Sequence, residues 1–274
     1  MSKTLLNRLA MFEVLDLLGP LTVTELARRS GLDVTVVSRT VAACEPAGWL
    51  TRVGGRVAIG PRCSLLGHNG PTADLIARAA LLVHAVAGVT GLLTHAYALI
   101  GADSVLIATA AGREPQVPAS LAVRAPLHAT PGGRAIAALL PPDRLVALLP
   151  EEPFPDASEI IATMTGTSAE PLFSKPPATG DPAARAGRLP STCGELGEQL
   201  AVSRASGVAV DGGGLDPAIN CVAMPWPYVT LPAAIGCLGT REALDADVAL
   251  VRKVLAAATT PGATPRDIIA AATA

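Results

Sequence analysis

The fold is decided by residues 22–40, which read TVTELARRSGLDVTVVSRT. Thr22 and Glu25 have the Thr-x-x-Glu spacing of a capping box, in which each side chain satisfies a backbone N–H that the first turn of a helix leaves free. Gly31 lies where this helix should end, because glycine adopts the left-handed C-terminal conformation at little cost. Asp33 can cap a second helix. The stretch therefore predicts two short helices joined by a tight turn.

The second of these helices has an apolar side and an outward side. Val37, Val41 and Cys44 recur at i, i+4 and i+7, so we expect them to form its buried stripe. The residues expected on the opposite side and its flanks are Thr35, Val36, Ser38, Arg39 and Ala42. A short helix exposed in this way can enter the major groove of DNA, where Arg39 is the one charged group available to read a base edge.

A two-stranded hairpin is predicted directly after the second helix. Two β-prone runs are joined by a glycine pair that supplies the positive φ angles of a tight turn, in the order Trp49–Val53, Gly54-Gly55, Arg56–Ile59. The cations expected to contact DNA phosphates, which position a protein without reading sequence, are Arg28, Arg52 and Arg56. Helices and hairpin together indicate a winged helix-turn-helix. The alternative is a small helical domain that has capped helices and a surface hairpin.

The N-terminal stretch resembles the winged helix-turn-helix of IclR-type transcriptional regulators, down to the closing GRVAIGPR of residues 55–62. Three later blocks are similar to segments of the same family, namely HATPGGRA at 128–135, GVAVD at 207–211 and INCVAMP at 219–225. The blocks stand in the family's order and cover most of the chain. The resemblance implies an α+β fold with an N-terminal winged helix-turn-helix, a linker helix and a C-terminal GAF-like effector domain, whose antiparallel sheet is flanked by helices.

A chain of 274 residues has room for two domains of typical size, about 100–200 residues each. We expect a DNA-binding domain at 1–63, a linker and linker helix at 64–88, and an effector-binding domain at 89–274. The linker helix should begin at a Thr72 cap and bury a stripe of Leu75, Ala79, Leu82 and Val86. Strands are expected at 92–100, 105–109, 121–126, 208–210, 219–224 and 233–238, and helices at 139–149 and 246–258.

Residues 151–191 stand apart because they are rich in Pro, Gly, Ser and Thr and have little apolar periodicity. A structureless loop longer than about 12–15 residues is usually functional or disordered. We interpret this stretch as a mobile surface segment, with an effector lid as the alternative. Ile160–Met164 is predicted to form one helical turn against the body.

A candidate ligand site lies at residues 130–134. Thr130 can cap a helix, Pro131 suits its first position, and the following glycines let an anion approach N–H groups at a positive helix end. The alternative is a plain helix start after a strand. In IclR-type regulators this turn and the later Asp and Cys blocks line the effector pocket, so the resemblance nominates Gly132, Gly133, Asp211, Ile219, Cys221, Gly236 and Leu238.

The nature of the effector follows from one departure from the family. Relatives have a Ser-x-Ser strand facing the effector, whereas this chain has Gly236-Cys237-Leu238. The resemblance therefore implies a less polar pocket. We expect a small amphipathic, anionic ligand.

Charge is divided along the chain. Residues 1–62 carry eight Lys and Arg against five Asp and Glu, a net of +3, and the remainder carries thirteen against eighteen, a net of −5. A basic module on an acidic body suits DNA binding at one end. Two copies would place two reading helices about one turn of DNA apart, which gives specificity that one helix lacks. The expected partners are a double-stranded DNA operator, a small-molecule effector and further copies of the chain, as a homodimer or a dimer of dimers.

Other classes of protein are disfavoured by what the sequence lacks. The N-terminus shows no signal peptide and no apolar run reaches the ~18 residues of a membrane span, so we expect a cytoplasmic protein without a membrane partner. The five cysteines have no C-x-x-C spacing, so we expect free thiols and neither a metal site nor a cofactor. We expect no catalytic residues, since the sequence has no nucleophile elbow, His-Glu-x-x-His pair or phosphate-binding loop.

Two alternatives stay open at this point. An enzyme would use Cys221 as a nucleophile with Asp211 and His128 beside it, although a lone cysteine on an apolar strand usually packs as a small hydrophobic residue. A regulator fold repurposed as a small-molecule binding protein or enzyme, with DNA binding weakened or lost, is the other alternative. It is favoured by Val34, which stands where relatives often have a basic residue.

Overall fold

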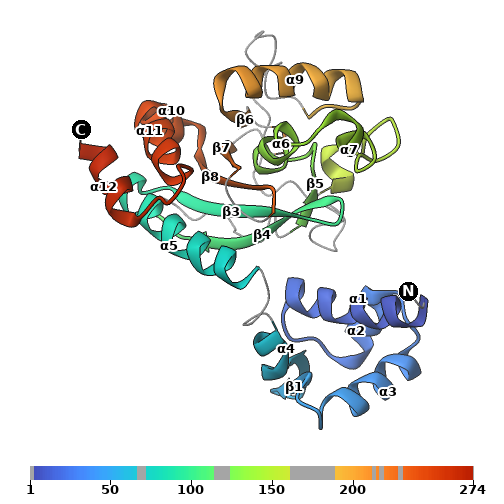
Figure 1. Ribbon diagram of the computed structural model, residues 1–274. Coiled ribbons are helices and arrows are strands. Elements are labelled where there is room, and N and C mark those ends of the chain that lie inside the picture. The colour runs from blue at the N-terminus through green and yellow to red at the C-terminus, as the bar shows by residue number, and fades with distance from the viewer. Residues whose placement is uncertain are drawn as a thin grey trace. The chain divides into compact units, whose positions relative to one another are not determined.

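The structure, a computed structural model, describes residues 3–66, 72–113, 124–160, 189–211, 214–215, 219–227 and 231–273. The chain divides into two units, Met1–Ala73 and Asp74–Ala274, the first of which is blue in Figure 1. The division falls between the domain limits expected from the sequence, at residues 63 and 89. Each unit is described separately.

The N-terminal unit consists of α1 (Lys3–Leu18), α2 (Val23–Ser30), α3 (Val34–Cys44), β1 (Leu50–Val53), β2 (Arg56–Ile59) and α4 (Pro61–Leu66). Its core is formed by apolar side chains from the helices and the hairpin, chiefly Met11, Leu15, Leu26, Val37, Val41, Leu50 and Val57. These residues come from every element except α4, so the two helices of the motif and the hairpin share a single core. The structure confirms the predicted winged helix-turn-helix arrangement.

The predicted caps are present in the structure. The hydroxyl of Thr22 accepts from the N–H of Glu25 at 3.2 Å, and the Glu25 carboxylate accepts from the N–H of Thr22 at 2.8 Å. Gly31 ends α2 in the left-handed region with a φ of 66°. Asp33 starts α3 by accepting from the N–H of Thr35 at 2.7 Å. The helix boundaries are therefore set by local chemistry that the sequence displays.

The hairpin forms as predicted and is attached to the helices. Gly54 and Gly55 have φ angles of 57° and 80°, and β1 pairs antiparallel with β2. Leu21 and Val57 exchange two backbone hydrogen bonds of 2.9 and 2.7 Å. This bridge holds β2 against the start of α2, so the wing is fixed relative to the helix-turn-helix.

The C-terminal unit is built on a six-stranded antiparallel sheet, in the order β5-β4-β3-β8-β7-β6. The strands are β3 (Leu93–Ile100), β4 (Asp103–Ala110), β5 (Arg124–Pro126), β6 (Ala209–Asp211), β7 (Ile219–Trp226) and β8 (Ala233–Thr240). The helices are α5 (Ala73–Thr90), α6 (Pro131–Ala138), α7 (Pro142–Val146), α9 (Cys193–Ser206), α10 (Arg241–Ala246), α11 (Val248–Ala258) and α12 (Pro265–Thr273). The unit has the predicted α+β composition.

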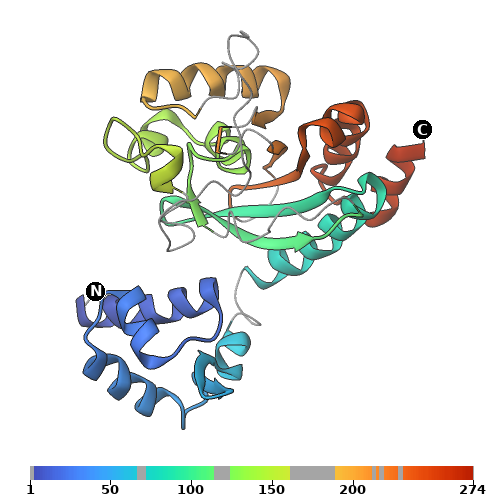
Figure 2. The ribbon, with the colours of Figure 1, turned by 180° about the vertical axis from the view of Figure 1, so that it is seen from behind.

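Helices cover both faces of this sheet, as Figures 1 and 2 show. On one face α6 and α9 pack against Tyr97, Ala223 and Ala234. On the other face α5, α11 and α12 pack against alternating residues such as Val222 and Ile235. Because side chains alternate along a strand, neighbouring residues of β7 and β8 belong to different cores. The unit therefore has three layers.

Helix α5 is 18 residues long and apolar enough by composition to cross a membrane. Its predicted stripe of Leu75, Ala79, Leu82 and Val86 is buried in the core against the sheet. A helix that buries one side in this manner and exposes Leu81 and Arg78 on the other is a core helix of the unit.

One prediction about the helices is wrong, one helix was not expected, and one predicted turn lies mostly outside the described residues. The helix predicted at 139–149 is wrong in extent, because α6 ends at Ala138 and α7 spans only Pro142–Val146. Consecutive prolines at 141 and 142 lack backbone donors and interrupt a continuous helix. Helix α9 was not expected. Beyond Ile160, which is buried, the turn predicted at Ile160–Met164 lies outside the described residues, as do residues 161–188 of the segment 151–191.

Candidate functional site

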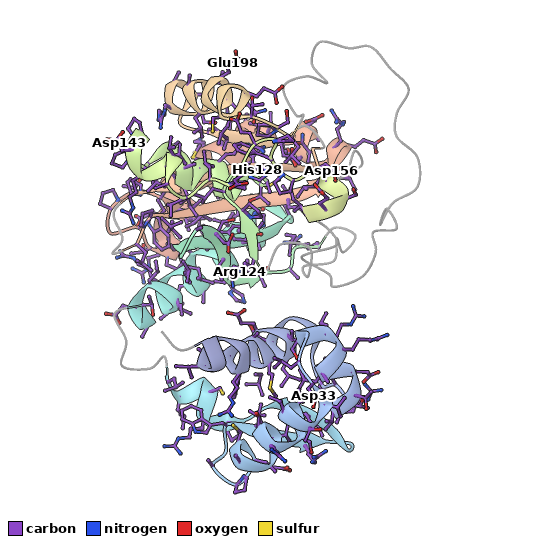
Figure 3. All side chains as sticks on the ribbon, turned by 90° about the vertical axis from the view of Figure 1, so that its right-hand side faces the viewer. Asp33, Arg124, His128, Asp143, Asp156 and Glu198 are labelled. Atoms are coloured by element: carbon purple, nitrogen blue, oxygen red, sulfur yellow. The ribbon has the colours of Figure 1, made fainter. Side chains whose placement is uncertain are left out.

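The outward side of α3 is the first candidate site. Val37 and Val41 are buried, with exposed fractions of 0% and 1%. Cys44, the third predicted member of the stripe, is only half-buried. The four candidate base-reading residues are all exposed, and they are Thr35, Val36, Ser38 and Arg39. Asp33 at the start of the helix is labelled in Figure 3. The helix thus turns short polar groups and one guanidinium to solvent while its opposite side anchors it.

Two of the three arginines expected to contact phosphates form ion pairs on the surface of the N-terminal unit. Arg52 forms an ion pair of 3.3 Å with Glu45, and Arg56 forms one of 3.0 Å with Glu25. Arg28 is exposed on α2. Exposed ion pairs contribute only about 0–1 kcal/mol, so a phosphate can replace either carboxylate at small cost. In the absence of DNA, the ion pairs with Glu45 and Glu25 orient Arg52 and Arg56 of the hairpin.

The second candidate site is the sheet face under α6. Cys221 on β7 lies opposite Asp211 on β6 and opposite Leu238 on β8. Because alternate residues share a face, Ile219 and Gly236 lie on the same side of the sheet as these three. The face is the one that packs against α6 through Ala223 and Ala234, as described above. The register thus brings the nominated strand residues to the side of the sheet that carries Gly132 and Gly133.

The two glycines at the start of α6 have a packing role. Both are buried. A methyl group on Gly132 would lie 2.6 Å from the ring of Tyr97, and one on Gly133 would lie 2.6 Å from the carbonyl oxygen of Leu127. The hydroxyl of Thr130 accepts from the N–H of Gly133 at 3.0 Å. The expectation that this N–H is open to an anion is therefore wrong, and of the glycine pair only the Gly132 donor is not used by the cap.

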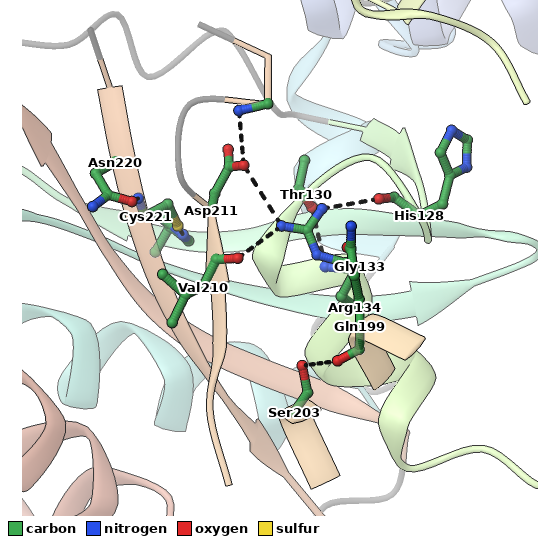
Figure 4. A network of polar contacts seen from close by, with 12 residues as sticks. His128, Thr130, Gly133, Arg134, Gln199, Ser203, Val210, Asp211, Asn220 and Cys221 are labelled. Carbon is green, nitrogen blue, oxygen red and sulfur yellow. Dashed lines mark hydrogen bonds and ion pairs between the residues drawn. The ribbon is translucent and has the colours of Figure 1, made fainter. Parts of the chain in front are cut away.

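A buried ion pair joins α6 to β6 (Figure 4). The guanidinium of Arg134 donates to the carbonyl oxygens of His128 and Val210, both at 3.1 Å, and lies 3.6 Å from the carboxylate of Asp211. That carboxylate also accepts from the N–H of Gly214 at 2.9 Å. The side chains of Arg134 and Asp211 are 3% and 9% exposed. Burial raises the pKa of Asp211, and the guanidinium opposes this rise. The carboxylate of Asp211 is therefore already engaged by Arg134 of α6 and by the N–H of Gly214.

A buried imidazole and thiol face each other beside this network. The Nε2 atom of His95 lies 3.6 Å from Sγ of Cys221. The ring of His95 packs edge-on against Tyr97, with ring centroids 4.9 Å apart. Burial lowers the pKa of His95 to about 4 and raises that of the Cys221 thiol well above 9. Both groups are therefore neutral at physiological pH.

Sequence reasoning did not single out His95, Tyr97 or Arg134. A signal for the first two existed in the alternation of LTHAYAL along the predicted strand, which puts His95 and Tyr97 on one face. Arg134 stood inside the block that the family resemblance identified, but nothing local in the sequence shows that its charge would be buried.

The fold is shared with solved structures, although no family model and no curated protein matches the sequence. An IclR homologue from Microbacterium hydrocarbonoxydans, complexed with 4-hydroxybenzoate, aligns over 99% of both chains with a TM-score of 0.67 and 18% identity. The chain has the IclR fold. An IclR regulator from Alicyclobacillus acidocaldarius aligns over 100% of this chain and 98% of that one, with a TM-score of 0.66 and 18% identity. The motif-based resemblance and the α+β fold class are thereby confirmed.

A protein from Rhodococcus sp. RHA1 that is described as a transcriptional regulator aligns over 100% of this chain and 99% of its own, with a TM-score of 0.63 and 20% identity. The alignments span both units of the chain. The likeness in fold therefore covers the winged helix-turn-helix and the sheet domain together.

Within the IclR fold of this chain, His128 does not approach Cys221. Its ring packs against Phe154, with centroids 4.7 Å apart, and Figure 4 shows it on the far side of Arg134 from the thiol. Figure 3 shows it among the side chains of the C-terminal unit. The hypothetical nucleophile and base formed by Cys221 and His128 are thus not assembled, and the imidazole beside Cys221 is that of His95.

The candidate metal ligands of the described residues do not gather. No group of three or more His, Cys, Asp or Glu side chains in the described part of the chain could hold a metal ion. The five cysteines are free thiols. The polar groups described on the sheet face under α6 are hydrogen-bonding groups and one internal ion pair.

Proposed function

We propose that this chain is a ligand-responsive transcriptional regulator that binds double-stranded DNA through α3 and a small amphipathic anion under α6. The observation that carries the proposal is the exposure of Thr35, Ser38 and Arg39 on a helix whose other side is fixed in the core. Such a helix can lie in a major groove with its side chains on base edges. The IclR fold of transcriptional regulators supports the same role.

Each group of exposed residues has its own part in DNA binding. Arg39 has the bidentate geometry that recognises guanine, and the hydroxyls of Thr35 and Ser38 can contact neighbouring bases. Arg52 and Arg56 on the wing contact phosphates after exchanging their glutamate partners, and they set the register of the helix. Two copies, as a dimer or a dimer of dimers in the cytoplasm, supply the paired reading helices of an operator.

The effector class is inferred from the groups on the α6 face. Leu238 and Ile219 offer apolar contact, whereas the N–H of Gly132, the imidazole of His95 and the thiol of Cys221 are neutral hydrogen-bonding groups. A positive helix end and neutral donors suit a single anionic or strongly polar end on an apolar body. The relative from Microbacterium hydrocarbonoxydans is complexed with 4-hydroxybenzoate, a carboxylate on an aromatic ring. The effector regulates by binding one arrangement of the paired DNA-binding units more tightly than another.

A binding protein without DNA affinity is the second candidate, and the ion pairs of Arg52 and Arg56 favour it. These pairs neutralise two of the cations that a DNA complex needs. Val34 at the start of α3 is 46% exposed and apolar, which further reduces the electrostatic attraction of this helix. An enzyme is disfavoured because a neutral buried thiol beside a neutral imidazole has no thiolate with which to attack.

The test is an electrophoretic mobility shift with the DNA next to the protein's own gene. Arg39→Ala is expected to weaken specific binding by roughly five- to 150-fold, since a bidentate arginine contributes about 1–3 kcal/mol of discrimination. Arg252→Ala, which removes an exposed arginine of α11 in the other unit, is the matched control and is expected to change nothing. Equal operator affinity in wild type and Arg39→Ala would refute the assignment of α3 as the reading helix.

Salt dependence separates the two candidates. For a regulator, the logarithm of affinity falls linearly with the logarithm of salt concentration, with a slope of about −0.9 per phosphate contacted. Replacing Arg28, Arg52 or Arg56 by Ala is expected to make this slope shallower by about one unit each. The absence of any DNA complex at low salt would instead support a small-molecule binding protein.

A further inference from the structure

A groove in the N-terminal unit has no part in the proposed function described so far. It lies between α1, α3 and α4 and has a volume of about 570 Å³. Its apolar wall includes Leu5, Leu9 and Phe12 of α1, Ala43 of α3 and Leu66 of α4. Small-molecule sites usually have volumes of roughly 300–1,000 Å³, so this groove has the size of a ligand site.

The wall of the groove is unusually open to solvent for apolar side chains. Leu5, Leu9 and Leu66 are 48%, 43% and 68% exposed. A contiguous exposed apolar surface is typical of a ligand-binding groove or an interaction site. Two polar groups in the lining are already satisfied, because the hydroxyl of Thr40 donates to the carbonyl of Val36 at 2.8 Å and the thiol of Cys63 donates to that of Trp49 at 3.2 Å. Neither group requires a polar partner from outside.

The charged groups of the groove are all cationic. Arg8 of α1 and Arg39 of α3 are exposed and line it, and no acidic residue of the described chain does. Among the described residues, no ion pair or hydrogen bond engages either guanidinium. An occupant with an apolar body and one anionic end would satisfy the wall and these cations together.

We infer that this groove binds an amphipathic carboxylate, of the class of medium-chain fatty acids, within the DNA-binding unit itself. A second copy of the chain is a poorer occupant. A two-fold pairing through this groove would bring Arg8 and Arg39 of both copies to one apolar surface whose lining has no carboxylate to neutralise them. A fatty acid brings the missing anion with it.

The site has a regulatory consequence that rests on the proposed function. Arg39 lines the groove and is also the proposed reader of a base. A carboxylate paired with this guanidinium withdraws it from DNA, so ligand and operator compete directly. This differs from an effector under α6, which acts from the other unit.

Trp49 provides a direct test because it lines the groove. The chain has two tryptophans, and Trp226 is buried in the C-terminal unit, so full-length Trp226→Phe reports on Trp49 alone. We expect 11-bromoundecanoate, added below its micellar concentration, to quench Trp49 saturably. Affinity for unbrominated fatty acids that displace it should rise about fourfold per added methylene, the equivalent of about 0.8 kcal/mol.

Variants at the two ends of the ligand sharpen this test. Arg8→Ala is expected to weaken the affinity for the quencher at least severalfold. Leu9→Asp places on the apolar wall a negative charge, as on the carboxylate ligand, and is expected to abolish quenching. The matched control is Leu81→Asp, because Leu81 is 61% exposed on α5 and does not line the groove. Quenching that is absent from the parent protein, or unchanged in both Arg8→Ala and Leu9→Asp, overturns the inference. Dissociation of a dimer by Leu9→Asp, with no quenching in the parent, would overturn it in favour of a second copy.

Competition with DNA is measured separately. Decanoate is expected to release DNA from the wild type and not from Leu9→Asp. If no DNA is bound even without decanoate, the proposed function fails while the quenching of Trp49 still decides the ligand site. Saturable quenching without DNA release would overturn the competition and uphold the site.

Discussion

Replacing Gly132 by Ala tests the packing of α6 on the sheet. The added methyl group would lie 2.6 Å from Cδ2 of the Tyr97 ring, where ordinary contacts begin at 3.4 Å, so ring and helix must separate by about 0.8 Å. The ring has little freedom to move, because Tyr97 is 4% exposed and packs edge-on against His95. Overpacking of this kind costs about 1–3 kcal/mol. Higher helix propensity returns up to ~1 kcal/mol, so the net destabilisation lies between about 0 and 3 kcal/mol, and we expect a value near the middle of that range.

Gly197→Ala is the matched control for this prediction. Gly197 lies in the middle of α9, is exposed, and has no atom within 4 Å of the position that a methyl group would occupy. The same chemical change should therefore stabilise the unit by about 0.5–1 kcal/mol. The predicted effects of the two glycine replacements have opposite signs.

The assay is urea unfolding followed by tryptophan fluorescence in full-length Trp49→Phe, in which only Trp226 remains. Because Trp226 is 2% exposed within the C-terminal unit, its emission reports that unit and not the separate transition of the N-terminal one. A Gly132→Ala variant as stable as its parent, or one stabilised as much as Gly197→Ala, would refute the close contact between α6 and Tyr97.

Three further predictions concern the α6 face. Burial lowers the pKa of His95 from 6.5 to about 4, so the neutral folded ring gives stability that is complete above pH 6.5 and lost as the pH falls to 4. The contribution of His95 to this loss should be about 3 kcal/mol, and melts should show that His95→Gln removes it and leaves the separate contribution of His128, whose pKa burial also lowers to about 4. Arg134→Met leaves the carboxylate of Asp211 buried without its cation and should cost about 3–5 kcal/mol in urea unfolding, while Arg134→Met with Asp211→Leu should cost clearly less. Leu238→Ser should weaken binding of amphipathic acids in a thermal-shift screen and hardly affect short oxoacids, and stabilisation of both proteins by short oxoacids alone would contradict an apolar pocket.

The local structure of the N-terminal unit could be predicted because its signals lie within a few residues of one another. The capping box of Thr22 and Glu25, the cap at Asp33 and the glycine pair of the hairpin each act over two to four positions, and all of them form. The same signal was overlooked at α9. Thr192 and Glu195 have the identical Thr-x-x-Glu spacing, and the Thr192 hydroxyl accepts from the N–H of Glu195 at 3.2 Å.

The chemistry of the α6 face could not be predicted in the same way. The close packing around Gly132 involves Tyr97, which is 35 positions earlier in the chain, and the partners of Arg134 include Asp211, 77 positions later. Local sequence shows that glycine and arginine stand there, but only the packed sheet shows what they contact. An open anion site was therefore predicted where the structure has a tight helix contact and an internal ion pair.

The tight contact and the ion pair that hold α6 limit how an effector of the proposed kind can act on the C-terminal unit. A buried ion pair adds little net stability compared with apolar residues of similar size, so the main effect of Arg134 and Asp211 is to fix the start of α6 to the end of β6. The absence of a side chain at Gly132 lets the same helix pack closely against Tyr97 on β3. A ligand under α6 must therefore fit between two fixed contacts or break one of them, and breaking the ion pair costs about 3–5 kcal/mol. Such a cost would cancel a large part of the roughly 4–8 kcal/mol that a ligand of millimolar to micromolar affinity gains, so we expect the effector to select an arrangement that keeps the ion pair and to act through the surroundings of His95 and Cys221.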